Sequence, residues 1–211
     1  MISLERFAPG KRGGVAAVAL ISVFALAGCE TAGDMMTSAK ETVTGAVSGE
    51  ETVEVGGAPM YPSRNIVENA VNSKDHTTLV AAVQAADLVE TLESPGPFTV
   101  FAPTNAAFDA LPAGAVDTLL EPENKPQLQK VLTYHVVPAA VTSADLRTMI
   151  VDDGGRHAIT TVSGGTLYAS QQDGKIMIED EMGHVGTVTI ADVYQSNGVI
   201  HVIDTVMLPE N

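Results

Sequence analysis

Cysteine, tryptophan and the other aromatic residues are scarce in this chain of 211 residues. Cys29 is the single cysteine in the sequence, which excludes an intrachain disulfide bond, a metal site with several thiolate ligands and a CxxC redox pair. There is no tryptophan, and aromatic residues make up 4% of the chain. The hydrophobic residues, 45% of the total, are therefore mainly Val, Ile, Leu, Ala and Met, and they suffice to bury a core.

Basic residues are few as well: 11 Lys and Arg stand against 26 Asp and Glu, which gives a net charge of −15. Binding to nucleic-acid phosphates needs clustered Lys and Arg, so this charge argues against a nucleic-acid partner. The sequence also lacks the GxSxG, GxGxxG, P-loop and HExxH motifs. It therefore predicts no enzyme, no cofactor and no metal site.

Residues 1–28 have the pattern of an export signal. Basic residues at positions 6, 11 and 12 precede an apolar run from Val15 to Gly28. The run is shorter than the roughly 20 residues of a membrane-spanning helix and has the length of a signal-peptide core. It ends in Leu26-Ala27-Gly28-Cys29, which resembles the bacterial lipobox, where the cysteine becomes the lipidated N-terminus of the mature protein. The alternative is an ordinary signal peptide that happens to end in a cysteine.

Lipidation of Cys29 implies a membrane anchor. One acyl chain gives only marginal membrane binding, and lipoprotein modification supplies a diacylglyceryl group together with an N-acyl chain such as palmitate. We expect an exported cell-envelope protein that is held at the inner or the outer membrane and faces the periplasm or the cell surface. Residues 29–57 then form a flexible acidic tether rich in Gly, Ser and Thr. A short helix is the alternative, because Met35, Ala39 and Val43 recur at four-residue spacing.

Residues 58–211 have the pattern of one folded domain. Hydrophobic residues recur at helical spacing up to Ile150, and β-branched runs separated by turn signals follow. Gly164-Gly165, Asp173-Gly174 and Asn197-Gly198 indicate hairpins, because primed turns require positive φ angles. Helices followed by a meander of strands indicate an α+β fold with mixed or antiparallel pairing. We expect helices over 66–71, 75–92, 105–111, 113–120, 124–134 and after 143, and strands over 98–101, 157–162, 166–170, 175–179, 185–191 and 198–203.

The segment GPFTVFAPTNAAFDALP (96–112) raises the question of a catalytic turn, because Thr104 and Asn105 follow an apolar strand where a helix begins. A nucleophile at Thr104 needs a base, and no His or Lys lies nearby in the sequence. As a helix N-cap, the hydroxyl would accept a backbone N–H, which stabilises a helix by about 1 kcal/mol. We favour capping. The acids Glu179-Asp180-Glu181 lack the spacing of a calcium loop and are interpreted as a solvated turn.

Two segments resemble the signature segments of the fasciclin domain family, and a third element lies between them. The two segments are Phe98–Phe108 and Asn197–Pro209, and Tyr134-His135-Val136 resembles the family's Tyr-His element. The resemblance covers residues 58–209 and implies a helical layer packed on a β-wedge, with the two segments as neighbouring core strands. It implies no catalytic machinery.

Buried polar residues in the second segment need hydrogen-bond partners. His201 and Asp204 are such residues, because the run around them is apolar on both faces. Our hypothesis is that polar groups of the 101–105 turn and His135 supply part of these partners.

The resemblance also implies a role in adhesion or attachment. In animal matrix members of the family the Tyr-His element is implicated in integrin binding, so Tyr134 and His135 are candidate binding residues, with a packing pair as the alternative. We expect a monomeric, non-enzymatic protein that attaches to a glycan or protein ligand of the envelope or the extracellular space. A carrier of a small apolar, carotenoid-like ligand is the first alternative, and a hydrolase is the second.

Overall fold

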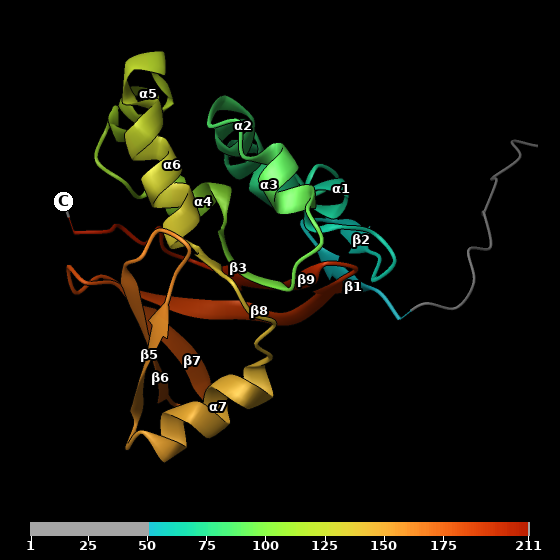
Figure 1. Cartoon of the computed structure of the whole chain (residues 1–211), viewed down its shortest axis with the longest axis vertical. Coiled ribbons are helices and arrows are strands. Elements are labelled where there is room, and N and C mark those ends of the chain that lie inside the picture. Colours follow the sequence, from blue (N-terminus) through green and yellow to red (C-terminus); the bar gives the residue numbers. More distant parts are fainter. Residues whose placement is uncertain (1–50, 211) are drawn as a thin grey trace, which may run out of the picture. The chain divides into compact units, whose positions relative to one another are not determined.

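The computed structural model describes residues 51–210, and its first element is a short β-hairpin (Figure 1). β1 (Val53–Val55) pairs antiparallel with β2 (Ala58–Met60) through a turn at Gly56 and Gly57, whose φ angles are +60° and +74°. The last residue of β1 is 4% exposed and belongs to the core. The domain therefore begins before residue 58, although we expected the tether to extend to residue 57. Gly56 and Gly57, which were expected in the tether, form the tight turn of this hairpin.

Most helices lie in one layer on one side of the sheet, and the last helix lies on the other side (Figure 1). The expectation of one helix over residues 75–92 is wrong. The chain leaves the helix at Asp87, which has a left-handed φ of +53°, and a second helix starts two residues later. The helices are α1 (Ile66–Ala70), the 3-10 helix η1 (Lys74–His76), α2 (Thr77–Ala85), α3 (Val89–Glu93), α4 (Asn105–Asp109), α5 (Ala115–Leu120), the 3-10 helix η2 (Pro122–Asn124), α6 (Lys125–Tyr134) and α7 (Ser143–Asp152).

The remaining strands form one seven-stranded mixed sheet in the order β4-β3-β9-β8-β7-β6-β5. β3 and β9, the second and third strands in this order, pair in parallel, and the other neighbours are antiparallel. This confirms the α+β class and the placement of the two signature segments as neighbouring strands. The strands are β3 (Phe98–Pro103), β4 (Val136–Val137), β5 (Arg156–Thr160), β6 (Thr166–Gln172), β7 (Lys175–Glu179), β8 (Val185–Gln195) and β9 (Gly198–Ile203).

The sheet separates two large hydrophobic cores, and a third, smaller cluster lies between α4 and α6. One core fills the space between the helical layer and β3 and β9, and includes Ile66, Leu132 and Ile200. The other lies where α7 packs against β5 and β6, and includes Leu146 and Leu167. β8 runs past both, and its register with β9 shifts twice between residues 188 and 193, where Asp192 has a φ of +58°. Irregular pairing of this kind bends a strand and increases its twist, which gives the sheet its wedge form.

Gly198, the first residue of β9, allows a close approach between strands. A side chain on Gly198 would place its Cβ 2.1 Å from the carbonyl oxygen of Phe98. A hairpin joins β8 to β9 as expected, but its turn residues are Ser196 and Asn197, since Gln195 pairs with Gly198, and neither turn residue has the positive φ of a primed turn. Asp173-Gly174 does have it, with φ angles of +52° and +78°. Gly198 is therefore required by the parallel contact with β3.

Candidate functional site

The turn after β3 is held by side-chain hydrogen bonds. Thr104 caps α4, because its hydroxyl accepts the Ala107 N–H at 3.3 Å. The Asn105 amide accepts the N–H of Thr78 at 3.0 Å and donates to the carbonyl of Lys74 at 2.8 Å. These hydrogen bonds connect the turn after β3 to η1 and to the start of α2. These contacts agree with the interpretation of Thr104 and Asn105 as structural residues.

Tyr134, at the end of α6, is completely buried. Its hydroxyl donates to the Thr166 carbonyl at 2.7 Å and accepts the Glu181 N–H at 3.1 Å. Burial raises the pKa of this hydroxyl to about 12, so the phenol stays protonated at neutral pH. Tyr134 therefore joins α6 to β6 and to the β7–β8 turn, as expected of a packing residue. A partner at the surface would not reach this side chain.

His135 follows directly and is also buried. Its Nε2 accepts the Met207 N–H at 2.9 Å, so the ring proton is on Nδ1, which donates to the Val131 carbonyl at 2.8 Å. Burial lowers the pKa of this imidazole to about 4, only partly offset by the hydrogen bond to Val131. Both nitrogens of the neutral ring are thus committed inside the domain. The placement of Tyr134 and His135 favours packing over the binding role that the resemblance implied.

His201, on β9, lies in the core with both ring nitrogens bonded. Its Nε2–H donates to the Val141 carbonyl at 2.9 Å, and Nδ1 accepts the Asp192 N–H at 3.2 Å. Its ring stacks on Phe101 with 5.7 Å between centroids, and burial lowers its pKa. Asp204 is exposed, and its carboxylate accepts the N–H of a β8 residue at 2.7 Å. The hypothesis that the 101–105 turn and His135 supply side-chain partners is therefore wrong, because β8 and the loop between β4 and α7 supply them.

Asp180 carries a role that sequence reasoning missed. Its side chain is fully buried, and its Oδ1 accepts the N–H groups of Met182 and His184 at 3.0 and 2.8 Å. Its Oδ2 accepts the Leu208 N–H at 2.9 Å and lies 2.8 Å from Nδ1 of His184. The interpretation of Glu179-Asp180-Glu181 as a solvated turn is wrong at its central residue. The signal in the sequence was the Asp three residues before Gly183, a pattern typical of turns closed by an Asp side chain.

Asn197 is a second residue whose side-chain hydrogen bonds the sequence did not indicate; we expected it only as a turn residue. Its side-chain oxygen accepts the Ile66 N–H at 3.0 Å, and its amide nitrogen donates to the carbonyls of Leu92 and Ser94 at 2.7 and 3.1 Å. It therefore joins the start of α1 and the end of α3 to the β8–β9 turn. Nothing local in the sequence indicates these partners, because all of them lie more than 100 residues away.

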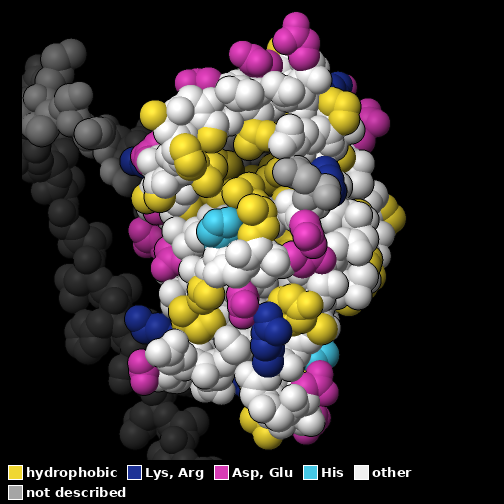
Figure 2. All heavy atoms as spheres, turned by 90° about the vertical axis from the view of Figure 1, so that its left-hand side faces the viewer, with side chains coloured by type: hydrophobic (Ala, Val, Ile, Leu, Met, Phe, Trp, Pro, Cys, Tyr) yellow, Lys and Arg dark blue, Asp and Glu magenta, His cyan; other side chains and the backbone are white. Residues whose placement is uncertain are grey.

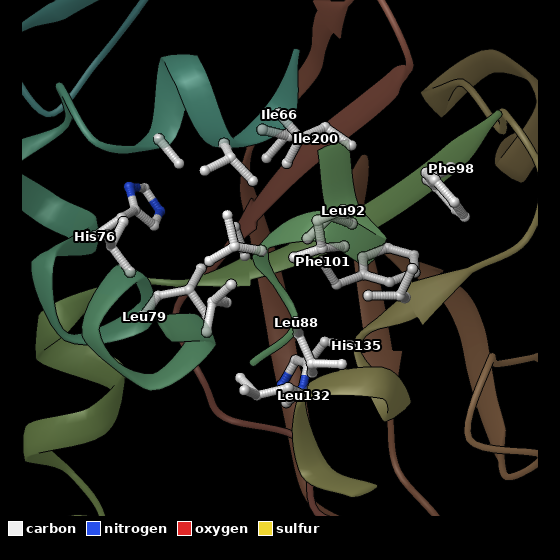
Figure 3. Close-up of a pocket in the computed structure, with 18 of the residues that line it drawn as sticks. Ile66, His76, Leu79, Leu88, Leu92, Phe98, Phe101, Leu132, His135 and Ile200 are labelled. Atoms are coloured by element: carbon white, nitrogen blue, oxygen red, sulfur yellow. The ribbon is translucent and has the colours of Figure 1, made fainter. Parts of the chain in front are cut away.

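A groove opens between the helical layer and the sheet. We call it the apolar groove: it has a volume of about 110 Å³, and α1, α2 and α3 form one wall while β3, β9 and the end of α6 form the other. In Figure 3, Ile66, Leu79 and Leu92 face this space from different helices, and His76 and His135 lie at separate points of the wall. Hydrophobic side chains also gather around a hollow in the helical half of the surface (Figure 2).

Other classes of site find no support in the part of the chain that the structure describes. Within residues 51–210, no group of three or more His, Cys, Asp or Glu side chains is placed to hold a metal ion. No helix in the same range is long and apolar enough to cross a membrane. Cys29, the export signal and the tether up to residue 50 lie outside the described residues, so the lipidation site stays a prediction.

Comparison with known proteins agrees with this architecture. The sequence profile of the Fasciclin domain matches residues 74–209. Protein sll1483 of Synechocystis sp. is 48% identical over 160 residues, which are 76% of this chain and 82% of that protein. The transforming growth factor-beta-induced protein ig-h3 of Sus scrofa is 33% identical over 148 residues, which are 70% of this chain and 20% of that protein.

A solved structure shows the same fold. It is a FAS1 domain pair from the insect cell adhesion molecule fasciclin I, which matches with a TM-score of 0.63 over 75% of this chain and 58% of that chain. The sequence identity is 17%, so the likeness concerns the fold alone. The fold expected from the resemblance is confirmed.

Proposed function

Because this chain belongs to the fasciclin domain family, we propose that it is a lipid-anchored cell-envelope protein whose domain mediates adhesion or attachment by binding, without catalysing a reaction. The proposal that the domain binds without catalysing a reaction is carried by one observation: the polar side chains considered above form hydrogen bonds within the domain. Thr104, Asn105, His135 and His201 each have hydrogen-bond partners within the domain, which leaves them committed to the fold. The adhesive part of the proposal is supported by membership of the family, whose resemblance implies a role in adhesion or attachment.

The anchor is proposed at Cys29. It follows an apolar run preceded by basic residues, as a lipoprotein signal requires. The acidic segment from residue 30 to the first strand at Val53 would then hold the domain away from the membrane surface at the inner or outer membrane. Two or more acyl chains on one cysteine make such anchoring stable.

The membrane anchor is tested by replacing Cys29 with Ala. We expect the wild-type protein in the membrane fraction, with an N-terminal peptide heavier by the mass of a diacylglyceryl group and an acyl chain. The Cys29→Ala chain should lack that mass and the processing at residue 29. An unmodified Cys29 thiol in the protein isolated from its host would contradict the anchor.

The attachment role is tested by affinity capture from the native host. The bait is the lipidated protein from its own membrane, and co-purifying glycans and proteins are identified by mass spectrometry. The ligand should be neutral or basic, because the chain carries a net charge of −15. The role is supported if cells without the gene attach less to a surface bearing the captured ligand. Unchanged attachment would contradict it.

A second candidate function, a carrier of a small apolar molecule, is favoured by the apolar groove. Interiors of proteins are close-packed with few voids, so a gap of about 110 Å³ with hydrocarbon walls is a notable departure. The volume suits a molecule far smaller than a carotenoid, because a cavity of about 150 Å³ holds benzene. A stoichiometric apolar molecule released from the native protein by solvent extraction would support this function, and an empty extract would count against it.

A further inference from the structure

The two edges of the seven-stranded sheet differ in how well they are protected. At one edge, β4 has only two residues, and its Val136 carbonyl accepts the N–H of Val162 at 2.7 Å. At the other edge, β5 has five residues and pairs only with β6 among the strands of residues 51–210 (Figure 1). An open edge presents N–H and C=O groups that can pair with another strand. β5 is therefore a candidate for pairing with a second chain.

The backbone of β5 faces the free edge at three residues. Thr161, which follows the strand, donates its N–H to the Gly165 carbonyl at 2.9 Å, so its backbone faces β6. In an antiparallel pair this direction alternates from one residue to the next. The N–H and C=O groups of Arg156, Ala158 and Thr160 therefore point away from β6, and all three residues are exposed.

The usual protection of an edge strand is missing from β5. Natural edges carry lysine, proline or a bulge. β5 contains neither lysine nor proline, and its register with β6 is regular from end to end. The guanidinium of Arg156 is turned onto the face of the sheet, where it lies 3.6 Å from the centre of the Tyr168 ring and 3.2 Å from the Glu179 carboxylate. Its charge thus lies over β6 and β7 and does not guard the edge.

A second copy of the chain fits this edge in an antiparallel arrangement. With the two-fold axis at Ala158, the two alanines face each other, and Arg156 of each copy lies opposite Thr160 of the other. Small side chains then meet at the axis, and no like charges lie directly opposite, an arrangement that would destabilise the pair. The outward N–H and C=O groups of these residues bond across the axis in both directions.

We propose that two copies of this chain pair through β5, antiparallel and centred on Ala158, and form one continuous sheet across both domains. The pairing goes beyond the attachment role proposed above, because it needs no ligand. Two five-residue strands bury far less than the roughly 1,200 Å² of a stable interface, so the dimer is weak in dilute solution. The net charge of −15 on each chain also opposes it, so added salt should strengthen the dimer.

The register is tested by disulfide formation in the full chain carrying Cys29→Ser, which removes the natural thiol. Chains with Arg156→Cys and chains with Thr160→Cys are mixed in equal amounts and mildly oxidised. Residues that lie opposite each other in this pairing have Cα atoms about 5.5 Å apart, within the range that a disulfide spans. The mixed dimer should exceed the two same-residue dimers together by several-fold. Random collision would make these amounts equal, and that result would overturn the pairing.

A second comparison measures the rate of disulfide formation at the axis. Ala158→Cys should form a dimer about ten-fold faster than Asp117→Cys, an exposed position on α5, because pairing raises the local thiol concentration. Adding Thr160→Pro should remove this advantage, since proline lacks the N–H that bonds across the axis and the lost N–H has no partner in β6. A melting curve shows whether the proline variant folds, and the mixed-dimer result decides alone if it does not. Equal rates for Ala158→Cys and Asp117→Cys, or a rate that survives Thr160→Pro in the folded chain, would overturn pairing through β5.

Discussion

Lowering the pH from near 7 to near 4.5 should destabilise this domain through His135. The unfolded imidazole has a pKa of 6.5, whereas burial lowers the pKa of His135 in the folded domain to about 4. As the pH falls below 6.5, the unfolded chain therefore takes up a proton that the folded chain does not. The free energy of unfolding decreases through this window and levels off below the folded pKa.

The size of the effect follows from the two pKa values. Between pH 7 and pH 4.5 their difference corresponds to a loss of about 2.5 kcal/mol in the free energy of unfolding. The cause of the lowered pKa is burial, which disfavours the charged ring. The geometry agrees, because Nε2 accepts the Met207 N–H and a second ring proton would face that donor. His76 and His201, whose pKa values burial also lowers, act in the same direction and steepen the dependence.

The assay is urea unfolding followed by circular dichroism across this pH range, with the native chain and His135→Gln compared. The glutamine amide can still accept the Met207 N–H but does not titrate. The native chain should lose about 2.5 kcal/mol more than the variant between the two ends of the range. Equal losses in the two proteins, or an NMR titration of His135 with a midpoint near 6.5, would refute the reasoning.

Three further predictions concern the hydrogen bonds that hold the fold, and each is checked by thermal and urea unfolding. The buried Thr99 hydroxyl donates to the Ala139 carbonyl at 2.6 Å and accepts a backbone N–H at 2.8 Å, so Thr99→Val should cost about 2 kcal/mol and Thr99→Ser much less. Asn105→Ala should also cost about 2 kcal/mol and lower the melting temperature by several degrees, and an unchanged melt would show that the amide does not hold the turn. Asp180→Asn should lower the free energy of unfolding by about 3 kcal/mol, whereas Asp204→Asn, at an exposed carboxylate, should lower it by under about 1 kcal/mol. Equal losses would contradict the role of the buried Asp180 carboxylate as an acceptor of three backbone N–H groups.

Local patterns in the sequence determined most of the elements and their order, but not the β1–β2 hairpin, β4 or the break between α2 and α3. The bounds of β7 and β9 agree with the expected ranges, because both strands are hydrophobic runs with turn residues at either end. Thr104 could be assigned as a cap from its position alone, because its partner is three residues away. The class of fold followed from helices that precede a meander of strands.

Only the tertiary structure decided which polar residues hold the fold and where a ligand has room. His135 finds its partner at Met207, 72 residues further on, and Asn197 reaches back more than 100 residues to Ile66 and Leu92. The apolar groove forms where α1, α2 and α3 pack opposite β3, β9 and the end of α6. Secondary structure reflects spacing along the chain, whereas hydrogen-bond partners and cavities depend on how distant segments pack, which no local pattern contains.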